Sequence, residues 1–398
     1  MLILSSKLQN IKPSITLLLA AKSNQLKKQG QKIISFGVGE PDFDTPDNIK
    51  LAAIKGIIEG KTKYTNADGT PELKAAIQQK FKRENNLDYQ ADEIIVSCGG
   101  KQVIYNLFMA TLNPEDEVIL PIPYWVSYPE MISLCSGKSV FAKCDDQLKL
   151  SPEELESKIT SKTKWLVLNS PNNPSGMCYT KQELVQLAKV LERHKHVYVM
   201  CDDIYEHIVF DDMKFITLAQ AAPELKERVF IVNGVSKGYA MTGWRIGYGA
   251  GDKKIIAGMG IIQSQSTSNP SSISQIAAIE ALNGRQDFIK TNNSNFQIKR
   301  DTALDILKQS PMLKCTKPDG AFYLFIDCTK LIGKTTPDGQ IIASADDFCS
   351  FLLQEAKVAV VPGGPFGMDG FFRLSFATSL ENITQGCEQI VRVCENLA

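Results

Sequence analysis

Short apolar runs alternate with amphipathic segments through the middle of the chain. Five runs have the length and β-rich composition of strands, at residues 94–97, 118–120, 165–168, 197–200 and 229–232. The segments between them have a helical period, as in the stretch with Leu184, Leu187, Ala188 and Leu191 on one face. This alternation predicts βαβ units, and hence an α/β fold with a mostly parallel sheet covered by helices on both faces.

The pattern changes in the C-terminal part, where helices and strands follow one another less regularly. Helices are expected at 299–307, 348–357 and 383–397, and strands at 321–326, 358–361 and 371–376. This order is typical of a smaller α+β unit. A helix between Pro13 and Gly30 and the apolar run at 33–36 have no partners nearby in the sequence, so we expect them to join that unit.

Charge and cysteine content limit the classes of function. Lys+Arg and Asp+Glu both number 44, so the chain has no overall positive field for nucleic acid or an anionic membrane, and acidic ligands need local cations. Ten cysteines without a CxxC pair are typical of reduced thiols in a cytoplasmic protein. Only three histidines are present, and we expect no metal site. The apolar run at 15–21 is too short to span a membrane, and we expect a mature, soluble protein.

Polar residues follow the carboxyl ends of the predicted strands, where ligands of open α/β sheets bind. Gly100 opens a helix after one strand, so backbone N–H groups can approach an anion there. Asn173, Asp202 and Lys237 follow three further strands. Each feature alone is also explained by a turn, a helix cap or a surface lysine. The glycine-rich run at 247–251 lacks the context of a dinucleotide site and predicts a loop.

Together these residues fit the requirements of one cofactor, pyridoxal phosphate. It needs an anion site, a lysine for a Schiff base, and a carboxylate that keeps the pyridine nitrogen protonated. The lysine must be partly neutral to attack, so it should lie among cations and away from bulk water. Arg245, eight residues after Lys237, is such a cation and can bind a phosphate through two N–H groups.

Ordered sequence blocks resemble the class I pyridoxal-phosphate-dependent aminotransferases, and among them the bacterial-type aspartate aminotransferases. The block at 236–248 resembles the cofactor-lysine signature, and further matches lie at 37–46, 64, 123–129, 170–176, 202–205 and 372–378. These blocks span nearly the whole chain. The resemblance implies the fold-type I architecture of pyridoxal-phosphate enzymes. Its large cofactor-binding domain would cover 48–285, and its small domain would be built from 1–47 and 286–398.

The resemblance also implies roles for the matching residues. Lys237 would form the Schiff base and shuttle the substrate proton, and Asp202 would pair with the ring nitrogen. Tyr205, also among the catalytic residues, and Asn173 would bond the ring's phenolic oxygen. The residues implied to bind the cofactor are Gly100, Lys101, Trp125, Asn173, Asp202, Tyr205, Ser236, Lys237, Arg245 and Tyr64. Tyr64 would reach the phosphate of a neighbouring subunit, which implies a homodimer with shared sites. In a departure from some relatives, Gly234 replaces a second phosphate-binding serine.

The residues implied to bind the substrate are Gly39, Trp125, Asn173, Arg373, Lys101 and Thr16. Arg373 would hold the α-carboxylate, whereas Lys101 and Thr16 match the pair that reads the second carboxylate in bacterial-type aspartate aminotransferases. The partial positive charge at a helix N-terminus disfavours a cation, so we expect Lys101 to be placed there to bind a ligand. The implied reaction transfers the amino group of aspartate to 2-oxoglutarate, giving oxaloacetate and glutamate by ping-pong kinetics.

Several alternatives remain open at this point. The pair of Lys101 and Thr16 also marks relatives that transaminate prephenate, which is dicarboxylic as well. Alanine or aromatic aminotransferases and C–S lyases share the fold. A non-catalytic sensor with a DNA-binding module is disfavoured, because the first block begins at Gly37 and the net charge is zero.

Overall fold

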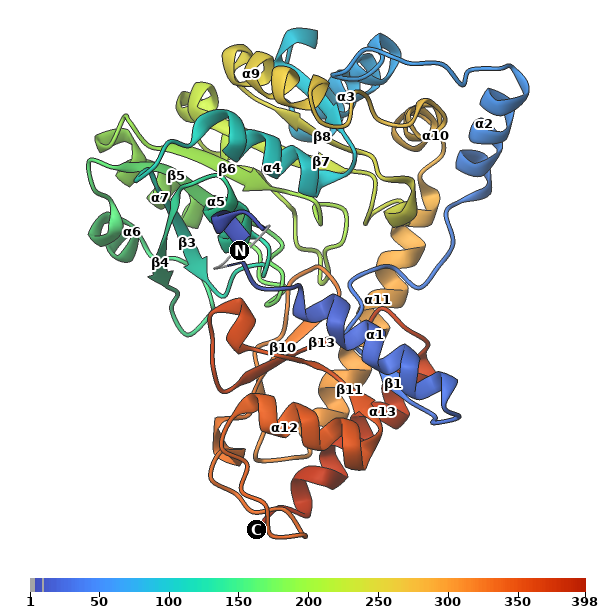
Figure 1. The fold of residues 1–398 in the computed structure, drawn as a ribbon, viewed down its shortest axis with the longest axis vertical. Coiled ribbons are helices and arrows are strands. Elements are labelled where there is room, and N and C mark those ends of the chain that lie inside the picture. The colour runs from blue at the N-terminus through green and yellow to red at the C-terminus, as the bar shows by residue number, and fades with distance from the viewer. Residues whose placement is uncertain (1–3, 9–10) are drawn as a thin grey trace.

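A seven-stranded sheet organises the larger part of the molecule (Figure 1). The computed structural model describes residues 4–8 and 11–398. The strand order is β2 (Ile94–Ser97), β8 (Gly247–Ala250), β7 (Val229–Gly234), β6 (Tyr198–Asp202), β5 (Thr163–Asn169), β3 (Glu117–Ile122) and β4 (Lys138–Lys143). Only β8 runs against the others, pairing antiparallel with both β2 and β7. The sheet is therefore mixed and mostly parallel, as predicted.

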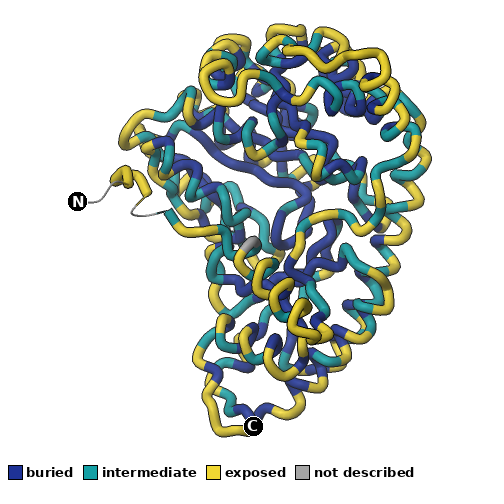
Figure 2. Tube along the Cα trace, turned by 45° about the vertical axis from the view of Figure 1, so that its right-hand side comes forward, coloured by how far each residue is buried: buried dark blue, intermediate teal, exposed yellow. Residues whose placement is uncertain are grey.

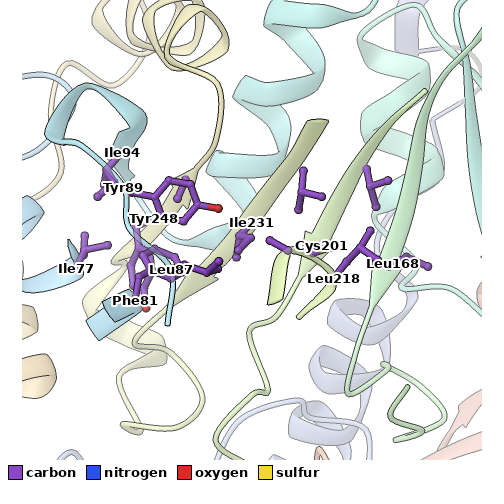
Figure 3. Close-up of a cluster of buried hydrophobic side chains, with 14 of the residues drawn as sticks. Ile77, Phe81, Leu87, Tyr89, Ile94, Leu168, Cys201, Leu218, Ile231 and Tyr248 are labelled. Carbon is purple, nitrogen blue, oxygen red and sulfur yellow. The ribbon is translucent and has the colours of Figure 1, made fainter. Parts of the chain in front are cut away.

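Alternating side chains of the strands enter two separate hydrophobic cores, one on each face of the sheet. Leu166 and Leu168 of β5 face one core, whereas Trp165 and Val167 face the other. The first core is covered by α3 (Pro71–Asn85), α7 (Lys181–Arg193) and α10 (Ser272–Asn283), and Figure 3 shows part of it around Phe81 and Ile231. The second is covered by α4 (Gly100–Thr111), α5 (Tyr128–Leu134) and α9 (Lys253–Ser264). Burial on both faces explains the uninterrupted apolar runs in the sequence.

Strand β8 corrects one prediction, because the run at 247–251 was expected to be a loop. A Cβ atom at Gly247 would lie 2.2 Å from the backbone nitrogen of Gly100, and one at Gly249 would lie 2.5 Å from the Phe230 ring. These glycines let neighbouring backbone and side chains approach the strand closely. A strand selected for small residues lacks the β-branched pattern on which the prediction depended.

A second group of elements lies below the large sheet in Figure 1. It contains a four-stranded antiparallel sheet with the order β12 (Val361–Pro362), β13 (Phe371–Ser375), β10 (Tyr323–Asp327) and β9 (Lys314–Cys315). Around it lie α1 (Ile15–Lys28), α11 (Asp287–Leu307), α12 (Ala345–Phe351) and α13 (Leu380–Glu395). Strand β1 (Ile34–Ser35) pairs with β11 (Val358–Ala359), so the N-terminal run does join the C-terminal elements.

Two C-terminal predictions differ from the structure in detail. The run at 358–361 was expected to be one strand, but it divides between β11 and β12, which belong to different sheets. Every residue of this run is buried, so hydrophobicity gave no sign of the division. The helix expected at 348–357 is α12 followed by a π-helical turn at Leu352–Ala356.

Helix α11 packs against both parts of the molecule. Phe288 and Ile289 contact the first core of the large sheet, whereas Phe296 and Ala303 belong to the core around the four-stranded sheet. The domain boundary at 286 stays a prediction, because one continuous helix follows it into both cores. The buried parts of the trace run through both regions, with exposed segments on the outside (Figure 2). None of the described helices is long and apolar enough to span a membrane.

Candidate active site

A cavity of about 270 Å³ lies at the carboxyl ends of the parallel strands. It is lined by twelve of the residues singled out in the sequence: Thr16, Gly39, Gly100, Lys101, Trp125, Asn173, Asp202, Tyr205, Ser236, Lys237, Arg245 and Arg373. Asp202 is the last residue of β6, and Ser236 and Lys237 follow β7 closely. Arg373 comes from β13 and Gly39 follows β1, so the two sheets enclose the cavity together.

The charges that line the cavity are strongly unbalanced. Its cations are Lys101, Lys237, Arg245 and Arg373, and its one carboxylate is that of Asp202. None of the four cations forms a salt bridge with an acid of residues 4–8 or 11–398. Arg373 is only 2% exposed, and its Nε has no hydrogen-bond partner in the described chain. A buried, unpaired guanidinium is costly, so this cavity suits a ligand with several negative charges.

One end of the cavity has the features of a phosphate site. Gly99 has a φ of 91°, and α4 begins at the next residue, Gly100. Arg245 donates to the carbonyls of Thr242 at 2.9 Å and Cys98 at 3.3 Å. A Cβ atom at Gly99 would lie 2.2 Å from Nη2 of Arg245, so glycine is what allows the guanidinium to lie against the helix N-terminus. The helix end and the guanidinium both favour an anion here.

Burial shifts the pKa values of the two central groups. It raises the pKa of Asp202 to about 6, although the hydroxyl of Tyr128, which donates to the carboxylate at 2.6 Å, opposes the shift. Burial lowers the pKa of Lys237 to about 8, with the charge of Glu40 opposing the shift and that of Arg373 adding to it. The Lys237 ammonium also donates to the carbonyl of Gly39. A lysine with a lowered pKa is more readily available as a neutral nucleophile.

A hydrogen-bonded group of side chains connects the two sheets across the cavity. The hydroxyls of Tyr205 and Tyr323 lie 2.8 Å apart. Arg373 donates from Nη1 to the side-chain oxygen of Asn173 at 3.0 Å and from Nη2 to the carbonyl of Gly37 at 2.8 Å. These contacts hold the phenol, the amide and the guanidinium in fixed positions.

The segment that carries Asp202 and Tyr205 is held from behind by a buried ion pair. Glu206 pairs with Lys80 of α3, whose side chain is completely buried, and accepts from the side chain of Asn233 at 2.7 Å. The ammonium of Lys80 supplies the counter-charge that the buried carboxylate needs. The loop after β6 is therefore anchored to both α3 and β7.

Lys101 and Thr16 approach the cavity from α4 and α1. The Lys101 ammonium lies 4.8 Å from the centre of the Trp125 ring, which is within the range of a cation–π contact. The hydroxyls of Thr16 and Ser14 lie 2.9 Å apart. Lys101 and Thr16 line the same cavity as Arg373, so the cavity has more than one place where a carboxylate can bind.

Comparison with known proteins identifies the family. Residues 31–390 match the family model described as "Aminotransferase class I and II". The chain belongs to this aminotransferase family. Its sequence is 62% identical over 400 residues to a probable aspartate/prephenate aminotransferase of Rickettsia felis, covering 100% of this chain and 98% of that one. It is also 49% identical to an aspartate aminotransferase of Rhizobium meliloti, covering 99% and 97% of the two chains.

Solved structures agree with this assignment. The aspartate aminotransferase of Rhizobium meliloti superposes with a TM-score of 0.97 at 48% identity, covering 100% of both chains. That of Thermus thermophilus with maleate gives 0.92 at 41% identity, covering 99% of this chain and 100% of that one. The resemblance read from the sequence blocks and the predicted fold class are both confirmed.

Some residues of this aminotransferase's cavity were not predicted, and one predicted residue lies elsewhere. The additional lining residues are Ile104, Tyr128, Asn169, Ile204, Thr242 and Tyr323. Tyr128 lies inside the recognised block at 123–129, and Asn169 immediately precedes the block at 170–176, so their positions were available as signals. Tyr323 stands in an apolar strand and gave none. Tyr64 is 90% exposed and does not line the cavity of its own chain.

Proposed function

We propose that this aminotransferase transfers the amino group of aspartate to 2-oxoglutarate, forming oxaloacetate and glutamate, with pyridoxal phosphate as its cofactor. The observation that carries the proposal is the cavity with four cations and one carboxylate. A phosphate-bearing cofactor and a dicarboxylic substrate together supply the missing negative charge. The printed names of the relatives, which include aspartate aminotransferases, agree with this substrate.

The side chains of the cavity fit pyridoxal phosphate. Gly100, Ser236 and Arg245 would hold the phosphate, and Asp202 would accept a hydrogen bond from the protonated ring nitrogen. Asn173 and Tyr205 would bind the phenolic oxygen. Trp125 would stack on the ring. When bound, the cofactor supplies an electron-withdrawing ring that stabilises negative charge at the substrate's α-carbon.

The chain's own groups provide binding and proton transfer. Lys237, with its pKa lowered to about 8, can take the proton from the substrate's α-carbon and would deliver it to C4′ of the cofactor. Burial raises the pKa of Asp202, and a protonated ring nitrogen beside it would favour the ionised carboxylate. Arg373 would bind the α-carboxylate, and its Nε has no other partner in the described chain. Burial around these groups limits access of water to the reacting atoms.

The second carboxylate of the substrate would bind to Lys101 and Thr16. This pair would favour a dicarboxylic acid over an apolar side chain. Prephenate is also dicarboxylic, and the relatives from Rickettsia carry both substrates in their names. A combined aspartate and prephenate activity is therefore the second candidate. Recording the cofactor absorbance with aspartate, alanine, phenylalanine and cystathionine separates these from the other aminotransferases and from C–S lyases.

Two substitutions test how the substrate is recognised. Lys101→Ala should lower kcat/KM for aspartate about ten- to a hundredfold, because it removes a charge-assisted contact of roughly 1.5–3 kcal/mol. Activity with phenylalanine should change little. Arg373→Ala should lower activity with both substrates, because every amino acid has an α-carboxylate. Equal losses for the two substrates in Lys101→Ala would contradict the dicarboxylate assignment.

The proposed enzyme acts as a homodimer in the cytoplasm. Helix α2 (Asp47–Ile58) exposes Leu51, Ile54 and Ile58 on one face, and Tyr64 extends beyond it. An apolar helix face of this kind is suited to contact with a second copy of the chain. Ten free cysteines suit a reducing compartment.

A further inference from the structure

Tyr323 contacts several of the groups that the proposed function uses. Its hydroxyl lies 2.8 Å from that of Tyr205, and its ring centre lies 4.5 Å from Cζ of Arg373. The side chain is almost completely buried. Tyr323 begins β10 of the four-stranded sheet, whereas Tyr205 follows β6 of the large sheet. The pair of hydroxyls is therefore a direct polar contact between the two sheets at the cavity.

The position of the Tyr323 hydroxyl is fixed by its surroundings. A Cβ atom at Gly39 would lie 2.6 Å from the hydroxyl oxygen but 3.7 Å from the ring carbon that carries it. The oxygen, and not the ring, therefore excludes a side chain at position 39. The ring packs against Phe322, with 4.8 Å between the ring centres, and against the Arg373 guanidinium. The buried ring, packed between these two side chains, holds the hydroxyl beside Tyr205.

The number of protons on the two hydroxyls determines which one donates. A tyrosine hydroxyl has one proton, and under the proposed function Tyr205 gives its proton to the phenolic oxygen of the cofactor. Its hydrogen bond with Tyr323 must then have Tyr323 as the donor. No other hydrogen-bond partner of the Tyr205 hydroxyl is present in residues 4–8 and 11–398.

We propose that Tyr323 is a positioning residue that acts through Tyr205. It directs the Tyr205 hydroxyl toward the cofactor oxygen and, by donating to it, makes Tyr205 a stronger donor. This inference rests on the proposed function. It assigns to a residue of the four-stranded sheet an influence on the cofactor that is bound mainly by the large sheet.

The pH dependence of the cofactor spectrum tests this role. With pyridoxal phosphate joined to Lys237, the visible absorption changes as the linkage loses its proton, and a hydrogen bond to the phenolic oxygen favours the deprotonated form. Tyr323→Phe keeps the ring against Arg373 and removes the hydroxyl. It should raise the midpoint of the spectral change by on the order of half a pH unit.

Three further variants make the test specific. Tyr205→Phe should raise the midpoint by more than Tyr323→Phe does, and the double variant should equal Tyr205→Phe alone. Tyr248→Phe is the matched control, because Tyr248 is a buried tyrosine of another core whose hydroxyl has no partner in the described chain. It should leave the midpoint unchanged. A wild-type midpoint in Tyr323→Phe, or equal shifts with and without the Tyr205 hydroxyl, would overturn the inference.

A measurement on the cofactor-free protein tests the fixed position independently. Gly39→Ala should lower the melting temperature, and it should lower it less in the Tyr323→Phe background, where the nearest atom lies at 3.7 Å. An equal decrease in both backgrounds would contradict the fixed position of the hydroxyl. If the wild-type protein gains no visible band with pyridoxal phosphate, the proposed function fails instead.

Discussion

Lys237 and Asp202 are two oppositely charged residues whose pKa values burial moves toward neutrality. The pKa of Lys237 falls from 10.5 to about 8, and that of Asp202 rises from 3.8 to about 6. Each group loses the hydration that stabilises its charge, and their mutual attraction offsets part of that loss. The lysine can therefore change its protonation within about a pH unit of neutrality, which suits a residue that transfers protons.

The lowered pKa of Lys237 predicts the pH dependence of cofactor attachment. Only the neutral amine attacks, so the rate at which cofactor-free protein forms the covalent link should rise about tenfold per pH unit below 8 and level off above it. Stopped-flow absorbance between pH 6 and 10 measures this rate. Borohydride reduction followed by peptide mapping should then place the label on Lys237, and Lys237→Ala should carry none.

Two results would contradict this prediction. One is a rate that continues to rise to pH 10.5, the pKa of an ordinary lysine, and the other is a label on another lysine.

The stability of the cofactor-free protein provides an independent check on the direction of the pKa shift of Lys237. Between pH 8 and 10.5 the unfolded chain holds more protons on this lysine than the folded chain does, so its contribution to stability should rise with pH.

Residues of the site could be predicted where the sequence marks a strand end. Asp202 and Lys237 follow apolar runs at the same edge of the sheet, and the lengths of those runs were sufficient to place them together. Tyr323 could not be predicted in this way, because a phenol in an apolar strand has the pattern of a core residue. Its contact with Tyr205 depends on how the two sheets pack, which no local pattern records.

At the scale of elements, the N-terminus of α4 and the Arg245 side chain form one anion site. The structure brings them together through the absence of a side chain at Gly99.

Five strands of the large sheet were predicted close to their observed bounds, because burial on both faces makes them continuously apolar. β4 and β8 escaped prediction. β4 has lysines at both ends and β8 is half glycine.

Gly99→Ala tests the anion site. The new Cβ would displace Arg245, and a φ of 91° is unfavourable for alanine. The affinity for pyridoxamine phosphate, which cannot bond covalently to Lys237, should fall about ten- to a hundredfold, because a charge-assisted contact is lost. Isothermal titration of the cofactor-free protein measures this. Gly260→Ala in α9 has no atom within 4 Å of the new Cβ and should bind normally. Unchanged affinity in Gly99→Ala would separate Arg245 from the phosphate.

At the scale of the whole molecule, α2 lies on the outside of the larger part of the molecule, next to α10, and packs only one of its faces against the chain (Figure 1). Gly56 contacts Ile276 of α10 on the packed face. On the other face, Leu51, Ile54 and Ile58 are 61%, 50% and 80% exposed. Spacings of three and four residues place them side by side on the helix.

The proposed homodimer can be tested through this face. Ile54→Asp should convert the protein from dimer to monomer. Dimer formation would then bury an unpaired carboxylate, which costs on the order of several kcal/mol of association free energy. Sedimentation velocity measures the assembly, and transaminase activity should fall with it. Ile298→Asp, at an exposed position of α11, is the control and should stay dimeric. A dimer that persists in Ile54→Asp would place the interface elsewhere.

Mixing two inactive variants tests whether the sites are shared. Tyr64→Ala and Lys237→Ala chains, unfolded and refolded together, should recover part of the wild-type activity, because one site of each mixed dimer then has both native residues. No recovery in mixed dimers would mean that Tyr64 does not serve the partner's site.

The order of strands in the two sheets determines when the cavity can form during synthesis. β3 to β7 pair with strands that are close in the sequence, so this part of the sheet can assemble as the chain emerges. β2 must wait for β8, and β1 must wait for β11 near the end of the chain. The phosphate site needs β8 beside β2, and the carboxylate site needs Arg373. The phosphate site can therefore form once β8 has emerged, whereas the carboxylate site must wait for Arg373, more than a hundred residues later in the chain.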